Sequence, residues 1–207
     1  MKKLLNSVYA GICAGLGTYV CMISSNEILG AFLFCVGIYS IAVFRMDLFT
    51  AETASIDSWK RPLRLVRILI GNILGAGLFG AFASFNPSAP PIAKALIEAK
   101  VSAPLQETAV SGILCGILIA LALKGYEEAE ENGKFLIVVL GATALVVSGG
   151  EHVFSDAFLA SAAYSADKFG GASTLWKHLA VVLGFNIIGS LAFAFVDAGR
   201  ERLMRRR

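Results

Sequence analysis

Charged residues are scarce in this sequence. Asp, Glu, Lys and Arg make up 16% of its 207 residues, whereas a soluble domain typically has about 25%. Hydrophobic residues make up 57%, and the mean hydropathy is +0.72. No polar stretch is long enough to build a soluble globular domain, so the composition excludes an ordinary soluble protein.

Cysteine is also sparse, and its placement excludes the usual cysteine chemistry. The four cysteines all lie inside apolar stretches, at Cys13, Cys21, Cys35 and Cys115, without the spacing of a metal site. Buried cysteine behaves as a small hydrophobe. We therefore expect no disulfide, no metal and no cofactor. No basic stripe interleaved with aromatics is present either, so the net charge of +3 does not indicate nucleic-acid binding.

The sequence does contain six apolar stretches. Five carry no charge and the sixth carries a single histidine: 4–26, 28–44, 68–93, 108–123, 135–150 and 178–196. A membrane-spanning helix needs roughly 20 apolar residues, with about 17–25 tolerated. Three stretches are long enough and three are marginal. The sequence predicts an all-α membrane protein with six transmembrane helices in one domain, 1–207, and we interpret the N-terminal run as the first span, not a signal peptide.

Lysine and arginine predict the orientation. They cluster before span one, between spans two and three, between four and five, and after span six, whereas the opposite side holds only Lys94, Lys100, Lys168 and Lys177. The positive-inside rule places both termini in the cytoplasm. We therefore expect a multi-pass protein of the cell (inner) membrane, with the lipid bilayer as a partner.

The chain also repeats itself. The segment 11–15 in span one resembles 112–116 in span four, and 72–75 in span three resembles 186–189 in span six. Three spans per half is an odd number, so we expect two inverted repeats, about 4–85 and 108–196. Glycines four residues apart, as in Gly11/Gly15, Gly71/Gly75 and Gly112/Gly116, are typical of closely packed membrane helices.

Spans two and five are interrupted. Asp47 follows the first, Glu151 and His152 follow the second, and apolar character then resumes. Matched interruptions in two halves indicate a transport site, because irregular backbone at membrane depth is tolerated only inside protein or against a cavity. We expect a second half-helix after each break and a common cavity between the breaks.

His152 is the leading site candidate, because it lies at the second break beside two glycines and changes charge near neutral pH. The alternative is a histidine that only bonds a neighbouring helix. Asp47 and Glu151 are interpreted as caps for freed backbone groups, and Asn72 and Asn186 as interhelical hydrogen-bond clamps. His178 is interpreted as an anchor at the membrane interface.

Taken in order, these residues resemble the formate/nitrite transporter family. The resemblance rests on 47–50, 71–72, Cys115 with 121–122, 151–152 and 186–189, and it runs through essentially the whole chain. It implies an aquaporin-like channel assembled as a homopentamer that passes formate, nitrite, hydrosulfide or lactate. It also implies that Leu48 and Phe49 line a constriction, that Thr50 lies on the loop of span two, and that His152 is the central histidine.

Several positions depart from the family pattern. Arg45 and Met46 stand where the family has a glycine and a small residue. Ala51 replaces a glycine or serine, and Gly116 and Asp156 each replace an asparagine. The stretch from Thr50 to Gly71 is also short for a second half-helix.

The predicted function is therefore passive or proton-linked transport of a small monovalent weak-acid anion, formate first, with His152 as the group that would provide the proton link. The alternatives are a nitrite or hydrosulfide channel and, from another class, a non-transporting scaffold subunit. Converging carboxylates, a nucleophile–base pair or metal ligands are not evident in the sequence, so we do not expect an enzyme.

Overall fold

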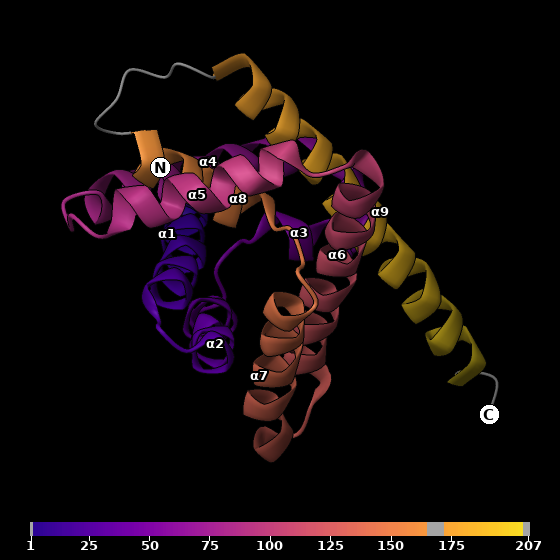
Figure 1. Ribbon diagram of the computed structural model, residues 1–207. Helices are drawn as coiled ribbons and strands as arrows, with labels where there is room; N and C mark the ends of the chain where they lie inside the picture. Colours follow the sequence, from indigo (N-terminus) through magenta and orange to yellow (C-terminus); the bar gives the residue numbers. More distant parts are fainter. Residues whose placement is uncertain (1, 165–171, 205–207) are drawn as a thin grey trace.

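The chain folds into helices joined by short connections. In the computed structural model, which describes residues 2–164 and 172–204, every regular element within those residues is helical (Figure 1). The elements are α1 (Lys2–Ile23), α2 (Glu27–Val43), α3 (Phe49–Glu52), the 3-10 helix η1 (Ile56–Lys60), α4 (Pro62–Ala83), α5 (Ala89–Ser102), α6 (Leu105–Glu128), α7 (Glu131–Val147), α8 (Val153–Tyr164) and α9 (Ala172–Met204).

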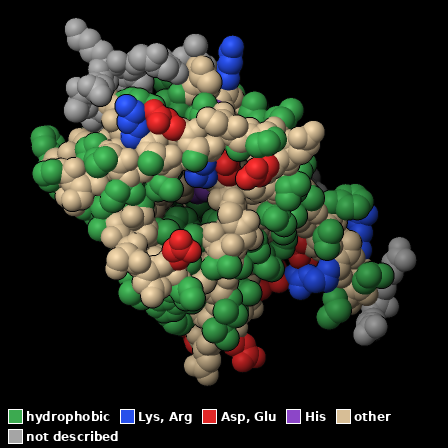
Figure 2. Space-filling model, in the orientation of Figure 1, with side chains coloured by type: hydrophobic (Ala, Val, Ile, Leu, Met, Phe, Trp, Pro, Cys, Tyr) green, Lys and Arg blue, Asp and Glu red, His purple; other side chains and the backbone are tan. Residues whose placement is uncertain are grey.

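Within the described residues, four helices are long and apolar enough to cross a membrane: α1, α4, α6 and the Thr174–Met204 part of α9. The helices α2 and α7 have 17 residues each, and α8 has 12. Large apolar side chains cover the outside, among them Leu63, Phe85 and Phe195, each more than 80% exposed. Hydrophobic side chains are spread over the face shown in Figure 2. An outer surface of this kind suits lipid and not water, as expected for a multi-pass membrane protein.

Glycine sets the closest helix contacts. The α1–α4 and α6–α9 pairs pack side by side, and a Cβ on Gly11 would lie 2.1 Å from the Asn72 carbonyl oxygen. A Cβ on Gly116 would lie 2.2 Å from the Asn186 carbonyl oxygen. Side chains at these positions would push the helices apart, so the packing interpretation of the glycine spacing is confirmed.

These contacts correct the register of the sequence repeat. The sequence comparison pairs Gly11 with Gly112, whereas the contacts make Gly11 equivalent to Gly116 and Ser7 equivalent to Gly112. The difference is four residues, about one helical turn. Small residues that recur once per turn look alike in any turn, so spacing alone could not distinguish the two registers.

Both expected interruptions are present. The α2 helix ends at Val43 and α3 begins at Phe49, while α7 ends at Val147 and α8 begins at Val153. Each first helix ends in a Schellman motif, in which a residue of positive φ follows the helix and two backbone N–H groups return to its last turn. At the first break the Arg45 N–H donates to Ala42 and the Met46 N–H to Ile41.

The second break has the same pattern. Gly149 donates to Val146 and Gly150 to Leu145. The positive φ belongs to Arg45 (50°) in the first motif and to Gly149 (68°) in the second. Arg45 therefore stands where glycine has the lower conformational cost.

The continuations of the breaks differ. The α8 helix provides three turns, whereas α3 has only four residues and leads into η1. The expectation of a second half-helix after each break is therefore met in the second half only, because the chain between α3 and α4 is too short.

The segment between the two halves also contains a helix, although it is rich in proline. Residues 89–102 form α5, which packs across α8 and buries Ala93 and Ile97 (Figure 1). This helix carries Lys100 toward the protein interior.

Candidate functional site

Asn72 holds the first break in place. Its side-chain NH₂ donates to the Ser7 carbonyl on α1 (2.7 Å) and to the Asp47 carbonyl in the break (2.9 Å). Its side-chain oxygen accepts from the Phe49 N–H (2.8 Å), which opens α3. One fully buried amide therefore joins α1, α4 and the N-terminus of α3.

Asn186 does the same for the second break. Its NH₂ donates to the Gly112 carbonyl on α6 (3.0 Å) and to the Glu151 carbonyl (2.7 Å). Its oxygen accepts from the Val153 N–H at the start of α8 (3.1 Å). The contacts match those of Asn72 atom for atom, so Leu48 and His152 hold equivalent places immediately before the resumed helices.

The two breaks meet at Thr50 and His152. The Thr50 hydroxyl oxygen lies 3.3 Å from His152 Nε2, although 102 residues separate them in sequence. Thr50 is fully buried and His152 is 1% exposed. On its other side, His152 Nδ1 lies 3.5 Å from the Ser155 hydroxyl. The structure thus brings together two of the four residues expected to line the solute path.

Leu48 and Phe49 precede Thr50 and are 0% and 5% exposed. Leu48 lies at the edge of a cavity of about 860 Å³ between the end of α2, α3, α6 and α9. Arg45 also lines this cavity, together with Lys124, Lys134 and several acidic residues. The residues that line this cavity include those of the first break, and the second break meets the first at the Thr50–His152 contact.

Asp47 does not cap backbone groups with its side chain. Its carboxylate lies 3.2 Å from Arg64 and 3.9 Å from Arg67, both in the first turns of α4. Arg64 also binds both oxygens of Glu52 at 2.5 Å. The capping interpretation of Asp47 is therefore wrong: its backbone carbonyl is held by Asn72, and its side chain pairs with arginine.

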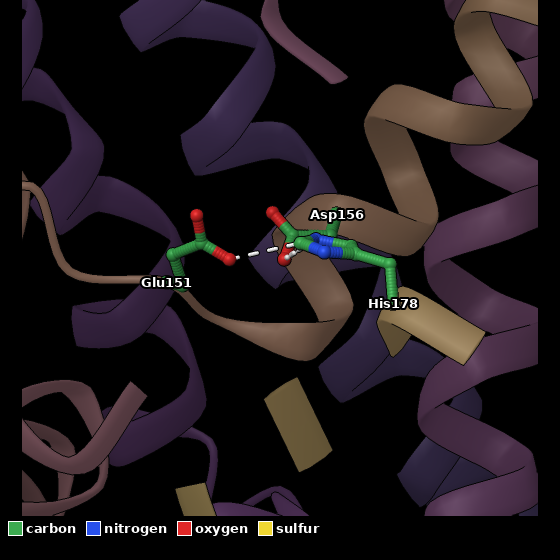
Figure 3. A group of neighbouring side chains, drawn as sticks. All are labelled: Glu151, Asp156 and His178. Atoms are coloured by element: carbon green, nitrogen blue, oxygen red, sulfur yellow. Dashed lines mark ion pairs between the residues drawn. The ribbon is translucent and has the colours of Figure 1, made fainter. Parts of the chain in front are cut away.

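Glu151 differs from the prediction in the same way. Its carboxylate faces Lys100 of α5 (3.6 Å) and His178 of α9 (3.4 Å). Asp156 of α8 faces the same two residues, Lys100 at 3.2 Å and His178 at 3.4 Å. Figure 3 shows both carboxylates beside His178. His178 is 8% exposed and lies inside this group, so its interpretation as an interface anchor is wrong.

Sequence reasoning missed three hydroxyl residues around the site. The Thr18 hydroxyl contacts that of Ser155 (2.8 Å), and the Ser190 hydroxyl donates to the Thr50 carbonyl (2.8 Å). All three are at least nine-tenths buried. Serine and threonine also occur in ordinary membrane helices. These three residues could therefore be recognised in the sequence only from their position on the helical turn relative to Asn186 and the breaks.

Comparison with known proteins decides the family. A family model described as formate/nitrite transporter matches residues 1–197. The chain belongs to this family. It is therefore a membrane transport protein with an anion-channel fold, and the resemblance noted in its motifs is confirmed.

Solved structures show the same fold. A protein named "FNT family ion channel" superposes with a TM-score of 0.81 at 20% identity, over 96% of this chain and 89% of that one. A protein named "Pentameric formate channel with formate bound" gives a TM-score of 0.75 at 18% identity, over 99% of this chain and 96% of that one. No curated protein sequence matches the chain.

Proposed function

We propose that this family member is a channel for a small monovalent weak-acid anion, with formate as the first candidate. The observation that carries the proposal is the contact of Thr50 with His152 at the meeting point of the two breaks. The hydroxyl and the imidazole can both hydrogen-bond a carboxylate, and both are shielded from water.

The apolar approach to this point gives the histidine a role. Moving an unpaired charge past Leu48 and Phe49 is expensive, because neither side chain can replace the water around an anion. A protonated His152 can bind the anion and pass it a proton, so that the neutral acid crosses the apolar part. The pathway residues are thus Leu48, Phe49, Thr50 and His152, with Asn72, Asn186, Asp47 and Glu151 holding the breaks.

The architecture of this channel is part of the proposal. We infer two inverted three-helix repeats, about 4–85 and 108–196, within a single channel domain of the cell (inner) membrane, with both termini in the cytoplasm. Support comes from the matched Asn72 and Asn186 contacts and the paired Schellman motifs. A homopentamer is inferred from the pentameric formate channel of the same fold.

Nitrite is the second candidate, because the family description names it beside formate. Hydrosulfide is a third, proposed from the family resemblance. Flux of formate, nitrite, hydrosulfide and lactate into proteoliposomes, compared in one assay, separates these candidates. A protein that moves none of them above empty liposomes is not a channel of this kind.

The role of His152 is tested by His152→Asn. Asparagine retains hydrogen bonding but cannot exchange a proton near neutral pH. General acid–base groups contribute about 10²–10⁴-fold to reactions. The transfer of one proton is the only bond change in this transport, so we expect a fall in formate flux of up to about 100-fold and a flattened pH profile. The flux is measured at several pH values, with assembly checked by size-exclusion chromatography.

Two further variants make the test specific. Thr50→Val removes the hydroxyl but keeps the histidine, so it should lower the flux while leaving the pH profile in place. Gly77→Ala is the control, because a Cβ at Gly77 meets open space. Equal rates and equal pH profiles for wild type and His152→Asn would show that His152 is only structural.

A further inference from the structure

A second polar group lies beside the site, on the far side of His152 from the cavity at the first break. It consists of Glu151 in the second break, Asp156 on α8 and His178 on α9, with Lys100 of α5 next to it. The side chains of Glu151, Asp156 and His178 are 7%, 0% and 6% exposed. Figure 3 shows both carboxylates and the imidazole pointing toward one another.

The oxygens of each carboxylate divide between two neighbours. Glu151 Oε1 and Asp156 Oδ1 face the Lys100 ammonium at 3.6 and 3.2 Å. Glu151 Oε2 and Asp156 Oδ2 face His178 Nε2, both at 3.4 Å. These three atoms have no hydrogen-bond partner among the described residues. A buried polar atom without a partner is costly, so something else is expected between them.

The spacing fits a metal ion. Zinc binds histidine nitrogen and carboxylate oxygen at about 2.0–2.2 Å in a tetrahedron, which places neighbouring ligand atoms about 3.3–3.6 Å apart. The two nitrogen–oxygen distances of 3.4 Å lie in this range. The same distance is long for a direct N–H···O hydrogen bond, whose mode is about 2.9–3.0 Å.

We propose that Glu151 Oε2, Asp156 Oδ2 and His178 Nε2 bind one divalent transition-metal cation per protomer, with Zn²⁺ as the ion to test. Water completes the tetrahedron. Two carboxylates and one imidazole form a ligand set for zinc and its neighbours, and the imidazole disfavours Ca²⁺ and Mg²⁺, which prefer oxygen.

Lys100 remains compatible with the ion. The Lys100 ammonium lies 3.6 Å from Glu151 Oε1 and 3.2 Å from Asp156 Oδ1, which are the oxygens opposite those that would bind the ion. Its repulsion reduces affinity, so we expect binding in the micromolar range and not the much tighter binding of structural zinc sites.

The ion would have a consequence for transport. Bound to these three side chains, the metal would tie the second break to α8 and α9 one residue from His152. This would restrict movement of the break and slow transport, whichever anion the channel carries.

The test is direct zinc binding to the full-length protein, purified in detergent and stripped with a chelator. Equilibrium dialysis with metal analysis should give one zinc per protomer for wild type. Asp156→Asn and His178→Gln, which keep polar groups of similar size, should each weaken binding at least about 10-fold. X-ray absorption should show one nitrogen and two or three oxygens at about 2.0–2.2 Å and no sulfur.

The control is Asp197→Asn, in a second acidic group formed with Glu128 and Glu201 at the surface; it should leave the stoichiometry unchanged. Size-exclusion chromatography and the thermal unfolding midpoint of the metal-free protein show whether each variant is intact. Absence of zinc from wild type, a sulfur ligand, or equal binding by intact Asp156→Asn and His178→Gln would overturn the proposal. None of these outcomes depends on whether formate is the solute.

Discussion

Arg45 should weaken the first break, and replacing it with glycine should stabilise the protein. Arg45 follows α2 with φ of 50°, in the left-handed region where a Cβ crowds the backbone. That conformation costs an L-residue about 1–2 kcal/mol. Glycine avoids the cost but loses about 0.5–1 kcal/mol through its greater freedom in the unfolded chain. We expect Arg45→Gly to raise the free energy of unfolding by about 0.5–1 kcal/mol.

The second break supplies the opposite experiment. Gly149 has φ of 68° in the equivalent position, and a Cβ there would meet no atom within 4 Å. Gly149→Ala therefore changes the backbone cost without a steric clash. The same arithmetic predicts that Gly149→Ala lowers the free energy of unfolding by about 0.5–1 kcal/mol.

Thermal unfolding in detergent, followed by circular dichroism, measures both effects. For a chain of this length 1 kcal/mol corresponds to roughly 2–4 °C in Tm, so we expect shifts of about 1–4 °C in opposite directions. Arg45→Ala is the control, because it removes the arginine side chain but retains the strained Cβ. If Arg45→Ala stabilises as much as Arg45→Gly, the effect comes from the side-chain charge, and the backbone argument is wrong.

Three further outcomes follow from the contacts. Gly75→Ala would place a Cβ 2.0 Å from the Val8 carbonyl oxygen and should impair assembly on size-exclusion chromatography, whereas Gly77→Ala on the same helix should be tolerated. Asn72→Ala removes three buried hydrogen bonds and, at roughly 1–3 kcal/mol for each group left unpaired, should lower the thermal midpoint by several degrees or prevent folding; an unchanged midpoint would contradict the clamp role. Leu48→Ala should raise lactate flux relative to formate in proteoliposomes, and an unaltered ratio would remove Leu48 from the constriction.

The spans and their interruptions could be predicted from the sequence because they depend on local properties. Runs without charge identify α1, α4, α6 and α9, and loss of apolar pattern at Asp47 and Glu151 identifies the breaks. Their order along the chain was enough to indicate the family. Each of these signals lies within about 20 consecutive residues.

The partners of the polar side chains could not be predicted in this way. Asp47 and Glu151 looked alike, as acids at matched breaks, yet one pairs with arginines of α4 and the other faces Lys100 and His178. In the sequence, Lys100 lies in the segment between spans three and four, and His178 is the first residue of the apolar stretch 178–196. Only the packing of α5 over α8 brings them to the same point.

The sequence alone therefore determined that the chain spans a membrane, where its spans break, and which family it belongs to, because hydrophobicity and motif order act over short stretches. Tertiary structure decided the register of the repeat, the meeting of Thr50 with His152, and the grouping of Glu151, Asp156 and His178. The reason is geometric: a pattern that recurs every helical turn does not specify which turn contacts a neighbour, and residues as far as 140 positions apart meet only when whole helices have packed.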